Sequence, residues 1–248
     1  MIDFQGKNIV ITGASSGLGE ALSIFLLNSN ANVIGIARNE EKLKSIKSKH
    51  SYFNYLVKDL TEDIDSNSKI LNEIFEKYGE ISGLILNAGI QETKPIAATN
   101  YESARKIFDV NYFANLSLIK GLKKKFVHQD GLSIVASSSI TSKLSIAGLA
   151  NYASSKAALE SLIRTISVEF EKMNVRANSV SIGHVKTELL NDSKLGNAYL
   201  EKLETIYTNG LIELENVNNT FAFLLSNLSK NINGSNIVLD SGVSNKFL

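Results

Sequence analysis

The sequence has 248 residues, of which 44% are hydrophobic and 21% are charged, a composition that excludes disordered and fibrous proteins. Its 26 basic and 25 acidic side chains nearly cancel, so no electrostatic interface for nucleic acid or an anionic membrane is expected. The absence of cysteine rules out disulfides and thiolate chemistry and agrees with an expected cytoplasmic location. The three histidines are scattered, so no histidine-built metal site is expected. The sequence shows no signal-peptide pattern, and no apolar run is long enough to predict a membrane span.

Short apolar and β-branched runs recur along the chain, with the length of strands that are buried on both faces. The predicted strands are Asn8–Thr12, Asn32–Ile36, Tyr52–Val57, Gly83–Asn87, Leu132–Ser137, Val175–Ser181 and Ser235–Leu239. Segments of helical period lie between them at Gly17–Asn28, Ser66–Tyr78, Tyr101–Phe126 and Asn151–Met173. This alternation calls for parallel pairing through right-handed crossovers. We therefore expect a single α/β domain over residues 1–248, with a doubly wound, seven-stranded, mostly parallel sheet and helices on both faces.

A glycine-rich segment follows the first predicted strand. Residues 13–19 read Gly-Ala-Ser-Ser-Gly-Leu-Gly and lead directly into the first predicted helix. Glycines here let backbone N–H groups at a helix N-terminus approach a diphosphate, whereas a Cβ atom would block the approach. Glycine also serves ordinary turns, but the position between a buried strand and an amphipathic helix favours a dinucleotide site.

Arg38 stands where dinucleotide sites usually place an acidic residue that binds the adenosine ribose. The second predicted strand ends in Ile36-Ala37-Arg38-Asn39, which contains no carboxylate. A guanidinium suits a ribose 2′-phosphate, which a carboxylate would repel. The sequence therefore favours NADP(H) over NAD(H), and an exposed arginine at a strand end is the alternative interpretation.

Tyr152 and Lys156 lie at the start of the long helix predicted over Asn151–Met173. Their spacing of four residues puts them on one helix face, where a cation favours the phenolate and lowers the pKa of the phenol toward neutrality. Such a tyrosine can act as a general acid or base on a carbonyl or an alcohol. This spacing is also common by chance, and for the motif alone an ordinary exposed helix pair is the better interpretation. Upstream, a predicted strand ends in Ser137-Ser138-Ser139, and a serine there either hydrogen-bonds a substrate carbonyl or simply serves a turn.

Taken together, these motifs resemble the classical short-chain dehydrogenase/reductase family, including its 3-oxoacyl-carrier-protein-reductase-like members. The resemblance covers the chain from Lys7 to about Gly242. It rests on Thr12–Gly19, Asp59-Leu60, Asn87-Ala88-Gly89, Val110-Asn111, Ser139, Tyr152 and Lys156, in order and at the family's spacing. It implies a Rossmann-type fold and an enzyme that moves a hydride between a nicotinamide cofactor and a carbonyl or secondary-alcohol carbon.

The resemblance also implies residue roles. The cofactor contacts it implies are Gly13, Ser15, Gly17, Leu18 and Gly19 at the diphosphate, Asp59 and Leu60 at the adenine, Asn87, Ala88 and Gly89 at the ribose, and Val185 and Thr187 at the nicotinamide carboxamide. Asn87 would also clamp neighbouring strands. The catalytic residues it implies are Tyr152 as acid/base, Lys156 as its cationic partner and a ligand of the nicotinamide ribose, Ser139 as the group that orients the carbonyl, and Asn111 as the holder of a relay water.

Three positions depart from the family pattern. Ile182 stands where the family usually has proline, so we expect a more mobile loop before the nicotinamide site. His184 lies two residues later, near the expected nicotinamide site. It is interpreted either as a substrate contact or as a packed or solvent-facing loop residue. Ser241 stands where a second glycine is more usual.

The leading interpretation is an NADP(H)-dependent oxidoreductase with a small-molecule carbonyl or alcohol substrate. The alternatives are a cofactor-retaining epimerase and a catalytically silent dinucleotide-binding sensor or scaffold. Residues 188–211 are expected to form a substrate lid, and Glu92 and Ser145 are candidates for the border of the same pocket. Acyl thioesters, sugars, steroids and small ketones stay open as substrates.

The resemblance also implies a homotetramer or homodimer. Its main interface would use the long helices predicted at Tyr101–Phe126 and Asn151–Met173, with the C-terminal strand in a second interface. A long helix that is apolar on more than one side needs cover beyond its own sheet.

Overall fold

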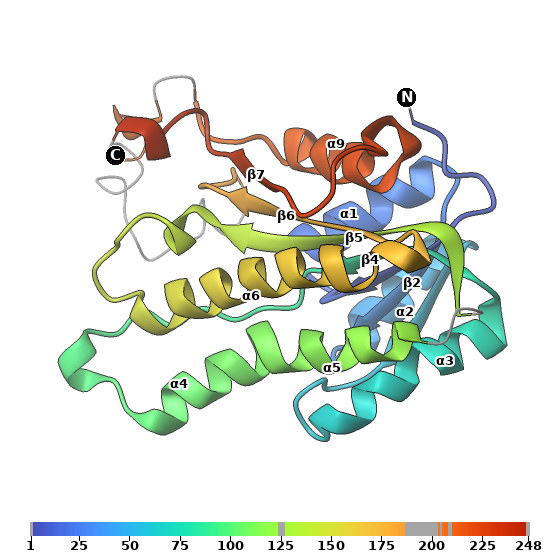
Figure 1. Cartoon of the computed structure of the whole chain (residues 1–248), viewed down its shortest axis with the longest axis horizontal. Helices are drawn as coiled ribbons and strands as arrows, with labels where there is room; N and C mark the ends of the chain where they lie inside the picture. The colour runs from blue at the N-terminus through green and yellow to red at the C-terminus, as the bar shows by residue number, and fades with distance from the viewer. Residues whose placement is uncertain (1, 124–126, 187–202, 204, 208–209, 247–248) are drawn as a thin grey trace.

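One seven-stranded sheet organises the chain (Figure 1). The computed structural model describes residues 2–123, 127–186, 203, 205–207 and 210–246. Within this part the strands pair in parallel in the order β3-β2-β1-β4-β5-β6-β7. They are β1 (Asn8–Thr12), β2 (Asn32–Ala37), β3 (Phe53–Val57), β4 (Ile81–Leu86), β5 (His128–Ser139), β6 (Arg176–Ile182) and β7 (Asn236–Leu239). All seven predicted strands are therefore confirmed, with ends that differ by a few residues.

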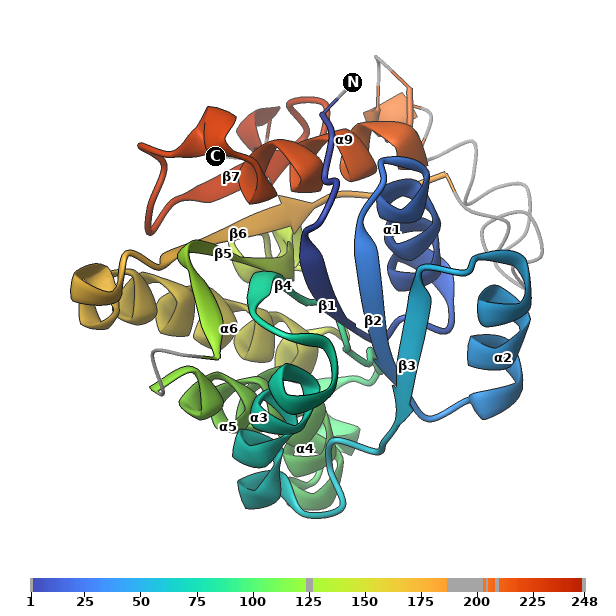
Figure 2. The same ribbon diagram turned by 90° about the vertical axis from the view of Figure 1, so that its right-hand side faces the viewer.

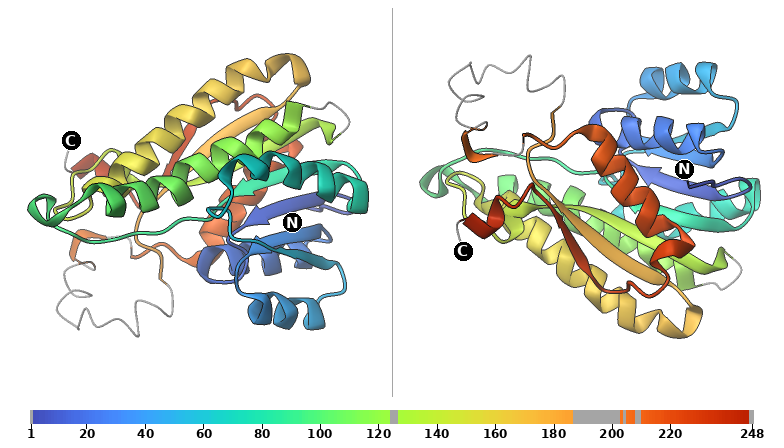
Figure 3. Two further views of the ribbon diagram at one scale, coloured as in Figure 1. Left: turned by 90° about the horizontal axis from the view of Figure 1, so that it is seen from below. Right: turned by 90° about the horizontal axis from the view of Figure 1, so that it is seen from above.

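Helices cover both faces of the sheet. They are α1 (Gly17–Asn28), α2 (Glu40–Lys49), α3 (Asn67–Tyr78), α4 (Tyr101–Phe108), α5 (Ala114–Lys120), α6 (Ala150–Glu169) and α9 (Leu214–Leu225). One buried cluster joins the sheet to α3, α5 and α6 through residues such as Leu71, Leu118 and Ile163. The other joins it to α1, α2 and α9 through Leu22, Leu43 and Phe221. Figure 3 shows these two sets of helices from opposite sides of the molecule.

The order of the strands explains where a site can form. The chain runs from β1 outward to β3 at one edge and then returns to β4, which pairs with the other side of β1 (Figure 2). The connections after β1 and β4 therefore leave the sheet toward opposite faces, and a crevice opens at the carboxyl ends of these two strands. Open α/β sheets bind their ligands at such a point.

The predicted helix Tyr101–Phe126 is wrong as a continuous element. A π-helical segment at Asp109–Phe113 separates α4 from α5, and a 3₁₀ turn follows at Gly121–Lys123. The cause is tertiary: Asn111 accepts from the backbone N–H of Ile90 at 2.8 Å and donates to its carbonyl oxygen at 3.0 Å. A π segment that accommodates one such side chain is a common feature near functional sites.

Other differences are smaller. The predicted helix Asn151–Met173 ends at Glu169 and continues as a 3₁₀ turn at Glu171–Met173. Two helices, α2 and α9, lie in segments for which no helix was predicted. The predicted lid at 188–211 lies largely outside the described residues. Among the residues that are described, no helix is long and apolar enough to cross a membrane, and no three His, Asp or Glu side chains gather as metal ligands would.

Candidate active site

The turn between β1 and α1 depends on glycine for reasons that the structure makes specific. Gly13 has a φ of +71°, and a Cβ atom there would lie 3.0 Å from the Cα atom of Ala88. A Cβ atom on Gly19 would lie 2.1 Å from the carbonyl oxygen of Gly13. Gly17 has a φ of +53° with open space around it. Gly19 is thus required by packing within the turn, and Gly17 by backbone conformation.

Thr12, the last residue of β1, ties this turn to the chain after β4. Its hydroxyl accepts from the backbone N–H groups of Asn87 and Ala88, both at 3.0 Å, and lies 3.4 Å from the carbonyl oxygen of Ile85. The sequence motif contains Thr12, but no role was predicted for it. The hydroxyl supplies hydrogen bonds where the two strands separate and backbone pairing ends.

Asn87 forms the clamp that the family resemblance implied. Its amide donates to the carbonyl oxygen of Thr12 at 3.3 Å, and its side-chain oxygen accepts from the Ser137 hydroxyl at 3.0 Å. The side chain therefore connects the ends of β1, β4 and β5. It also lines the crevice between them.

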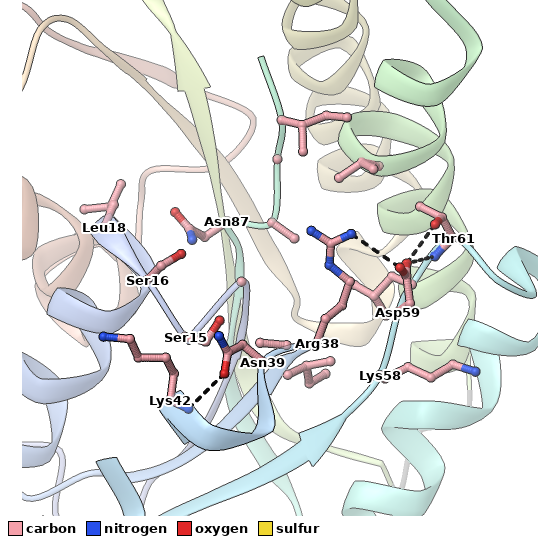
Figure 4. A pocket seen from close by; sticks show the side chains of 18 residues that line it. Ser15, Ser16, Leu18, Arg38, Asn39, Lys42, Lys58, Asp59, Thr61 and Asn87 are labelled. Carbon is pink, nitrogen blue, oxygen red and sulfur yellow. Dashed lines mark hydrogen bonds and ion pairs between the residues drawn. The ribbon is translucent and has the colours of Figure 1, made fainter. Parts of the chain in front are cut away.

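A cavity of about 740 Å³ lies at the carboxyl ends of β1, β2 and β3 (Figure 4). Nine of the predicted cofactor residues line it: Gly13, Ser15, Leu18, Arg38, Asp59, Leu60, Asn87, Ala88 and Gly89. Further lining residues, absent from the prediction, include Asn39, Lys42, Lys58 and Thr61. Gly17 and Gly19 are not among the lining residues. The structure therefore brings nine of the predicted residues together around one cavity, and Lys42 and Lys58 add positive charge that was not predicted.

Arg38 and Asp59 meet across this cavity. An Arg38 guanidinium nitrogen lies 3.5 Å from a carboxylate oxygen of Asp59, and the Arg38 side chain is largely exposed. Burial acts to raise the pKa of Asp59, but two hydrogen bonds from Thr61 and the Arg38 charge outweigh it, so this pKa is lowered. An exposed ion pair of this kind contributes little to stability, so Arg38 can exchange its partner at small cost.

Lys42 enters the cavity because α2 begins directly after β2. The Asn39 side chain caps this helix by accepting from the Lys42 backbone N–H at 3.0 Å. The cap sets Lys42 in the first turn, so that its side chain lines the same cavity as Arg38 and Ser15. Three cations, Arg38, Lys42 and Lys58, thus line the adenosine end of the predicted cofactor site.

A second cavity, of about 580 Å³, adjoins the first and shares Leu18, Asn87, Gly89 and Ile90 with it. It is lined by Tyr152 and Lys156 from α6, by the strand end Ser137–Ser139 and by His184. The structure thus brings together three of the four predicted catalytic residues at one end of a continuous crevice. Asn111 is buried beside it, in the π-helical segment.

Lys156 is buried, and its Nζ atom donates to the carbonyl oxygen of Ser137 at 2.7 Å. The same atom lies 5.7 Å from the centre of the Tyr152 ring. The Tyr152 phenol interacts with the Ser139 hydroxyl, to which Thr141 also donates at 3.0 Å. Strand β5 therefore positions both the lysine, through a carbonyl group, and the tyrosine, through a hydroxyl group.

The predicted lowering of the tyrosine pKa is wrong for the protein by itself. Burial raises the pKa of Tyr152, and the hydrogen bond with Ser139 only partly opposes this. Burial also lowers the pKa of Lys156 to about 8, with Glu160 acting in the opposite direction. Both groups lose hydration together, and this shared loss outweighs the attraction that their spacing suggests.

Asn111 uses its side chain within the protein. Besides its two hydrogen bonds with the backbone of Ile90, its amide donates to the Ser155 hydroxyl at 2.9 Å. Both amide hydrogens are therefore engaged. The prediction that Asn111 holds a relay water stays a prediction.

His184 is a packed loop residue that also faces the second cavity. Its backbone N–H donates to the Tyr207 hydroxyl at 2.9 Å, and its Nδ1 atom lies 3.2 Å from the same oxygen. Burial lowers its pKa.

Neither Glu92 nor Ser145 lines this cavity, and Gln91 and Thr93 line it instead. Val185 pairs with Ile212 in an isolated bridge, and Thr187 lies outside the described residues.

Comparisons with known proteins show which family and fold this chain shares. A family model described as short chain dehydrogenase matches residues 7–197. L-xylulose reductase of Caenorhabditis elegans is 30% identical over 247 residues, which are 98% of each chain. 3-oxoacyl-[acyl-carrier-protein] reductase of Rickettsia felis is 31% identical over 98% of this chain and 99% of its own. The structure of a gluconate 5-dehydrogenase from Burkholderia cenocepacia J2315, in complex with NADP and tartrate, superimposes with a TM-score of 0.88 at 23% identity, over 98% of this chain and 97% of its own.

Proposed function

The chain belongs to the short-chain dehydrogenase family and is an oxidoreductase for alcohol or carbonyl groups, and we propose that it uses NADP(H) with Tyr152 as the general acid/base. The observation that supports this most strongly is the position of Tyr152, Lys156 and Ser139 at one end of a crevice whose other end carries Arg38 and Lys42.

The crevice has the form of a dinucleotide site. Its two cavities meet at Asn87 and Gly89, between the glycine turn and α6. A Cβ atom on Gly89 would lie 3.3 Å from both the Lys156 Nζ atom and the Asn111 side-chain oxygen, so a larger residue would narrow this passage. The adenosine half of the cofactor would occupy the first cavity and the nicotinamide half would occupy the second. Gly13, Ser15 and Leu18 would then adjoin the diphosphate.

The choice of NADP(H) rests on charge. A ribose 2′-phosphate carries close to two negative charges, and Arg38 and Lys42 face the space that it would occupy. Arg38 would leave Asp59 for the phosphate, and Asp59 would become free to accept from the adenine amino group. The gluconate 5-dehydrogenase found in complex with NADP supports the same choice by analogy.

The bound cofactor supplies a hydride at its nicotinamide ring, and the side chains of this protein handle the proton. In reduction, the Ser139 hydroxyl holds the substrate carbonyl oxygen, and the Tyr152 hydroxyl transfers its proton to that oxygen as negative charge develops there. Lys156 stabilises the resulting phenolate and holds the nicotinamide ribose. Oxidation reverses these steps, with the Tyr152 phenolate as the base.

We also propose a homodimer or homotetramer. Several of the large apolar side chains that are exposed support this proposal. Tyr101, Phe113 and Val168 lie on the side of α4, α5 and α6, and Phe223 and Val238 lie on α9 and β7. The long helices and the C-terminal strand β7 are the elements expected from the sequence at the two interfaces, and exposed apolar side chains on them favour such contacts.

The test is a steady-state assay of NADPH and NADH oxidation with a panel of pentuloses, hexonates with a keto group, small ketones and 3-oxoacyl thioesters. Turnover of at least one carbonyl compound, lost in Tyr152→Phe, is the expected result. Tight cofactor binding without turnover of any compound would instead favour a sensor or scaffold. Inversion of a substrate centre without net consumption of cofactor would favour an epimerase.

A further inference from the structure

Glu160 is a buried carboxylate on α6, one helical turn after Lys156. Its Oε1 atom accepts three hydrogen bonds: from the Ser138 hydroxyl at 2.6 Å, from the Ser142 hydroxyl at 2.6 Å and from the Ser181 hydroxyl at 2.7 Å. These lengths are typical of hydroxyl groups that donate to an ionised carboxylate. None of the predicted catalytic roles involves this residue.

The three serines come from separate segments that converge on one oxygen. Ser138 and Ser181 are directly paired in the register of β5 and β6, and Ser142 lies in the short turn that follows β5. Glu160 therefore fastens α6 to both strands at the point where the strands end. The Ser181 hydroxyl also accepts from Asn236 on β7 at 3.0 Å, which extends the network to the edge of the sheet.

This anchoring reaches the catalytic groups through β5. Ser138 lies between Ser137, whose carbonyl oxygen binds Lys156, and Ser139, whose hydroxyl interacts with Tyr152. A shift of the Ser138 backbone would move both of these atoms. The position of Glu160 thus determines where the strand end presents them to α6.

Charge provides a second connection. Lys156 and Glu160 are both buried on the same helix, four residues apart. The titratable side chains that face the Lys156 ammonium within the described chain are Tyr152 and Glu160, both on α6, and His184 in the loop after β6 lines the same cavity. The strand end and the π-helical segment contribute only uncharged groups there. Glu160 is therefore the one carboxylate in this set.

We propose that Glu160 is a positioning residue of this active site, whose carboxylate anchors the end of β5 and balances the buried charge of Lys156. The proposal rests on the proposed function, because it concerns the same tyrosine and lysine. The interaction that raises the pKa of Lys156 against the effect of burial agrees with it. Loss of the charge with retention of the shape should therefore let Lys156 lose its proton at lower pH.

Glu160→Gln provides this test, because the amide oxygen can still accept from the three serines while the charge is removed. We expect the alkaline limb of the pH profile for carbonyl reduction to move down by about one pH unit. The control is Glu169→Gln, which removes an exposed carboxylate at the end of the same helix and should leave the profile unchanged. A profile of Glu160→Gln that coincides with that of the wild type would overturn the proposal.

Direct titration of Lys156 keeps this test separate from activity. The ¹³Cε resonance of Lys156, assigned by its loss in Lys156→Arg, should titrate about one pH unit lower in Glu160→Gln than in the wild type. This readout needs no substrate, so it can succeed where the proposed function fails. An unchanged titration would overturn the charge role even if the enzyme is active.

Glu160→Asp separates the anchoring of β5 from the charge beside Lys156. It also provides a second test if the glutamine variant does not fold. The shorter side chain keeps the charge but cannot reach all three serines. We expect Lys156 to titrate close to its wild-type pH while kcat falls about tenfold. Wild-type kcat in this variant would overturn the anchoring role.

Discussion

The Nζ atom of Lys156 donates to the carbonyl oxygen of Ser137 at 2.7 Å, so the lysine on α6 is fixed to the strand end that also carries Ser139. A backbone carbonyl cannot change its protonation state, and its acceptor geometry is set by the sheet. The ammonium is thus held in place by the fold itself and keeps two further N–H donors for a ligand. The predictions on catalysis follow from this arrangement.

Tyr152→Phe should reduce kcat by about 10²–10⁴-fold, because the proton donor for the developing alkoxide is removed while the ring and its packing remain. Binding of the cofactor, measured by fluorescence titration, should change little. Tyr52→Phe, on an exposed residue directly before β3, is the matched control and should be fully active. Retention of more than about a tenth of the wild-type kcat, with chemistry rate-limiting, would contradict the assigned role.

Lys156→Ala should lower both kcat and cofactor affinity, because it removes the positive charge beside Tyr152 and a ligand of the ribose. The double variant with Tyr152→Phe should be only slightly worse than the tyrosine variant, since the lysine acts partly through the tyrosine. A thermodynamic cycle of kcat/KM measures this coupling. Fully additive effects would show that the two residues act independently.

The pH dependence should differ between the two directions. Lys156, with a pKa of about 8, is cationic below this pH and increasingly neutral above it. Tyr152, with a raised pKa, stays protonated through neutrality. Reduction should therefore hold steady through neutral pH and decline above about pH 8 as the lysine loses its charge. Oxidation should rise from acidic toward neutral and mildly alkaline pH, because its base is the phenolate. Initial rates in both directions measure these limbs, and reduction that still increases above pH 9 would contradict this assignment.

Arg38→Ala should weaken NADPH binding by roughly ten- to a hundred-fold, equivalent to about 1.5–3 kcal/mol, with a smaller effect on NADH. Lys42→Ala should act in the same direction, and both effects should shrink at high salt. Lys44→Ala is the control, because Lys44 lies on the same helix but pairs with Glu40 and does not line the cavity. Tighter binding of NADH than of NADPH by the wild type would reject the assignment.

The glycine turn should tolerate substitution unequally. In Gly19→Ala the new Cβ atom would meet the Gly13 carbonyl oxygen at 2.1 Å, and we expect a loss of about 3 kcal/mol in the free energy of unfolding. Gly17→Ala meets no atom within 4 Å and should lose about 1 kcal/mol, through its positive φ alone. Urea denaturation of both variants measures the difference, and the reverse order would show that the turn can rearrange.

The strands could be predicted from the sequence because each is a short apolar run, but two helices could not. Helix α2 buries only Leu43 and Ile46, so its apolar stripe is too thin to stand out. The π-helical segment depends on hydrogen bonds between Asn111 and Ile90, residues 21 positions apart, which no local pattern records. The local pattern of apolar residues thus identified the strands of the sheet. It failed where a contact with a distant residue determines the backbone conformation.

The candidate site could be predicted where a sequence motif identifies the residue. It could not be predicted where the property depends on burial or on contacts between distant segments. Tyr152, Lys156, Ser139 and the glycine turn follow from motifs. The direction of the Tyr152 pKa depends on burial, which the spacing of four residues does not contain. Glu160 was missed because its three partners come from three separate segments. Lys42 was missed because its approach to the cavity depends on where α2 begins.

The hydroxyl of Thr12 has a consequence for how fast a ligand binds. It accepts from the backbone N–H groups of Asn87 and Ala88, directly after the end of β4, so the crevice is held open by bonds that exist before any ligand arrives. A crevice of fixed width needs no slow opening step, and little conformational entropy is lost when it is filled. The rate of association should then be set by the encounter of protein and ligand. In stopped-flow experiments the observed rate constant should rise in proportion to ligand concentration, without reaching a plateau. In Thr12→Val the observed rate constant should instead reach a plateau at high ligand concentration, because the loosened strand ends make a conformational step rate-limiting.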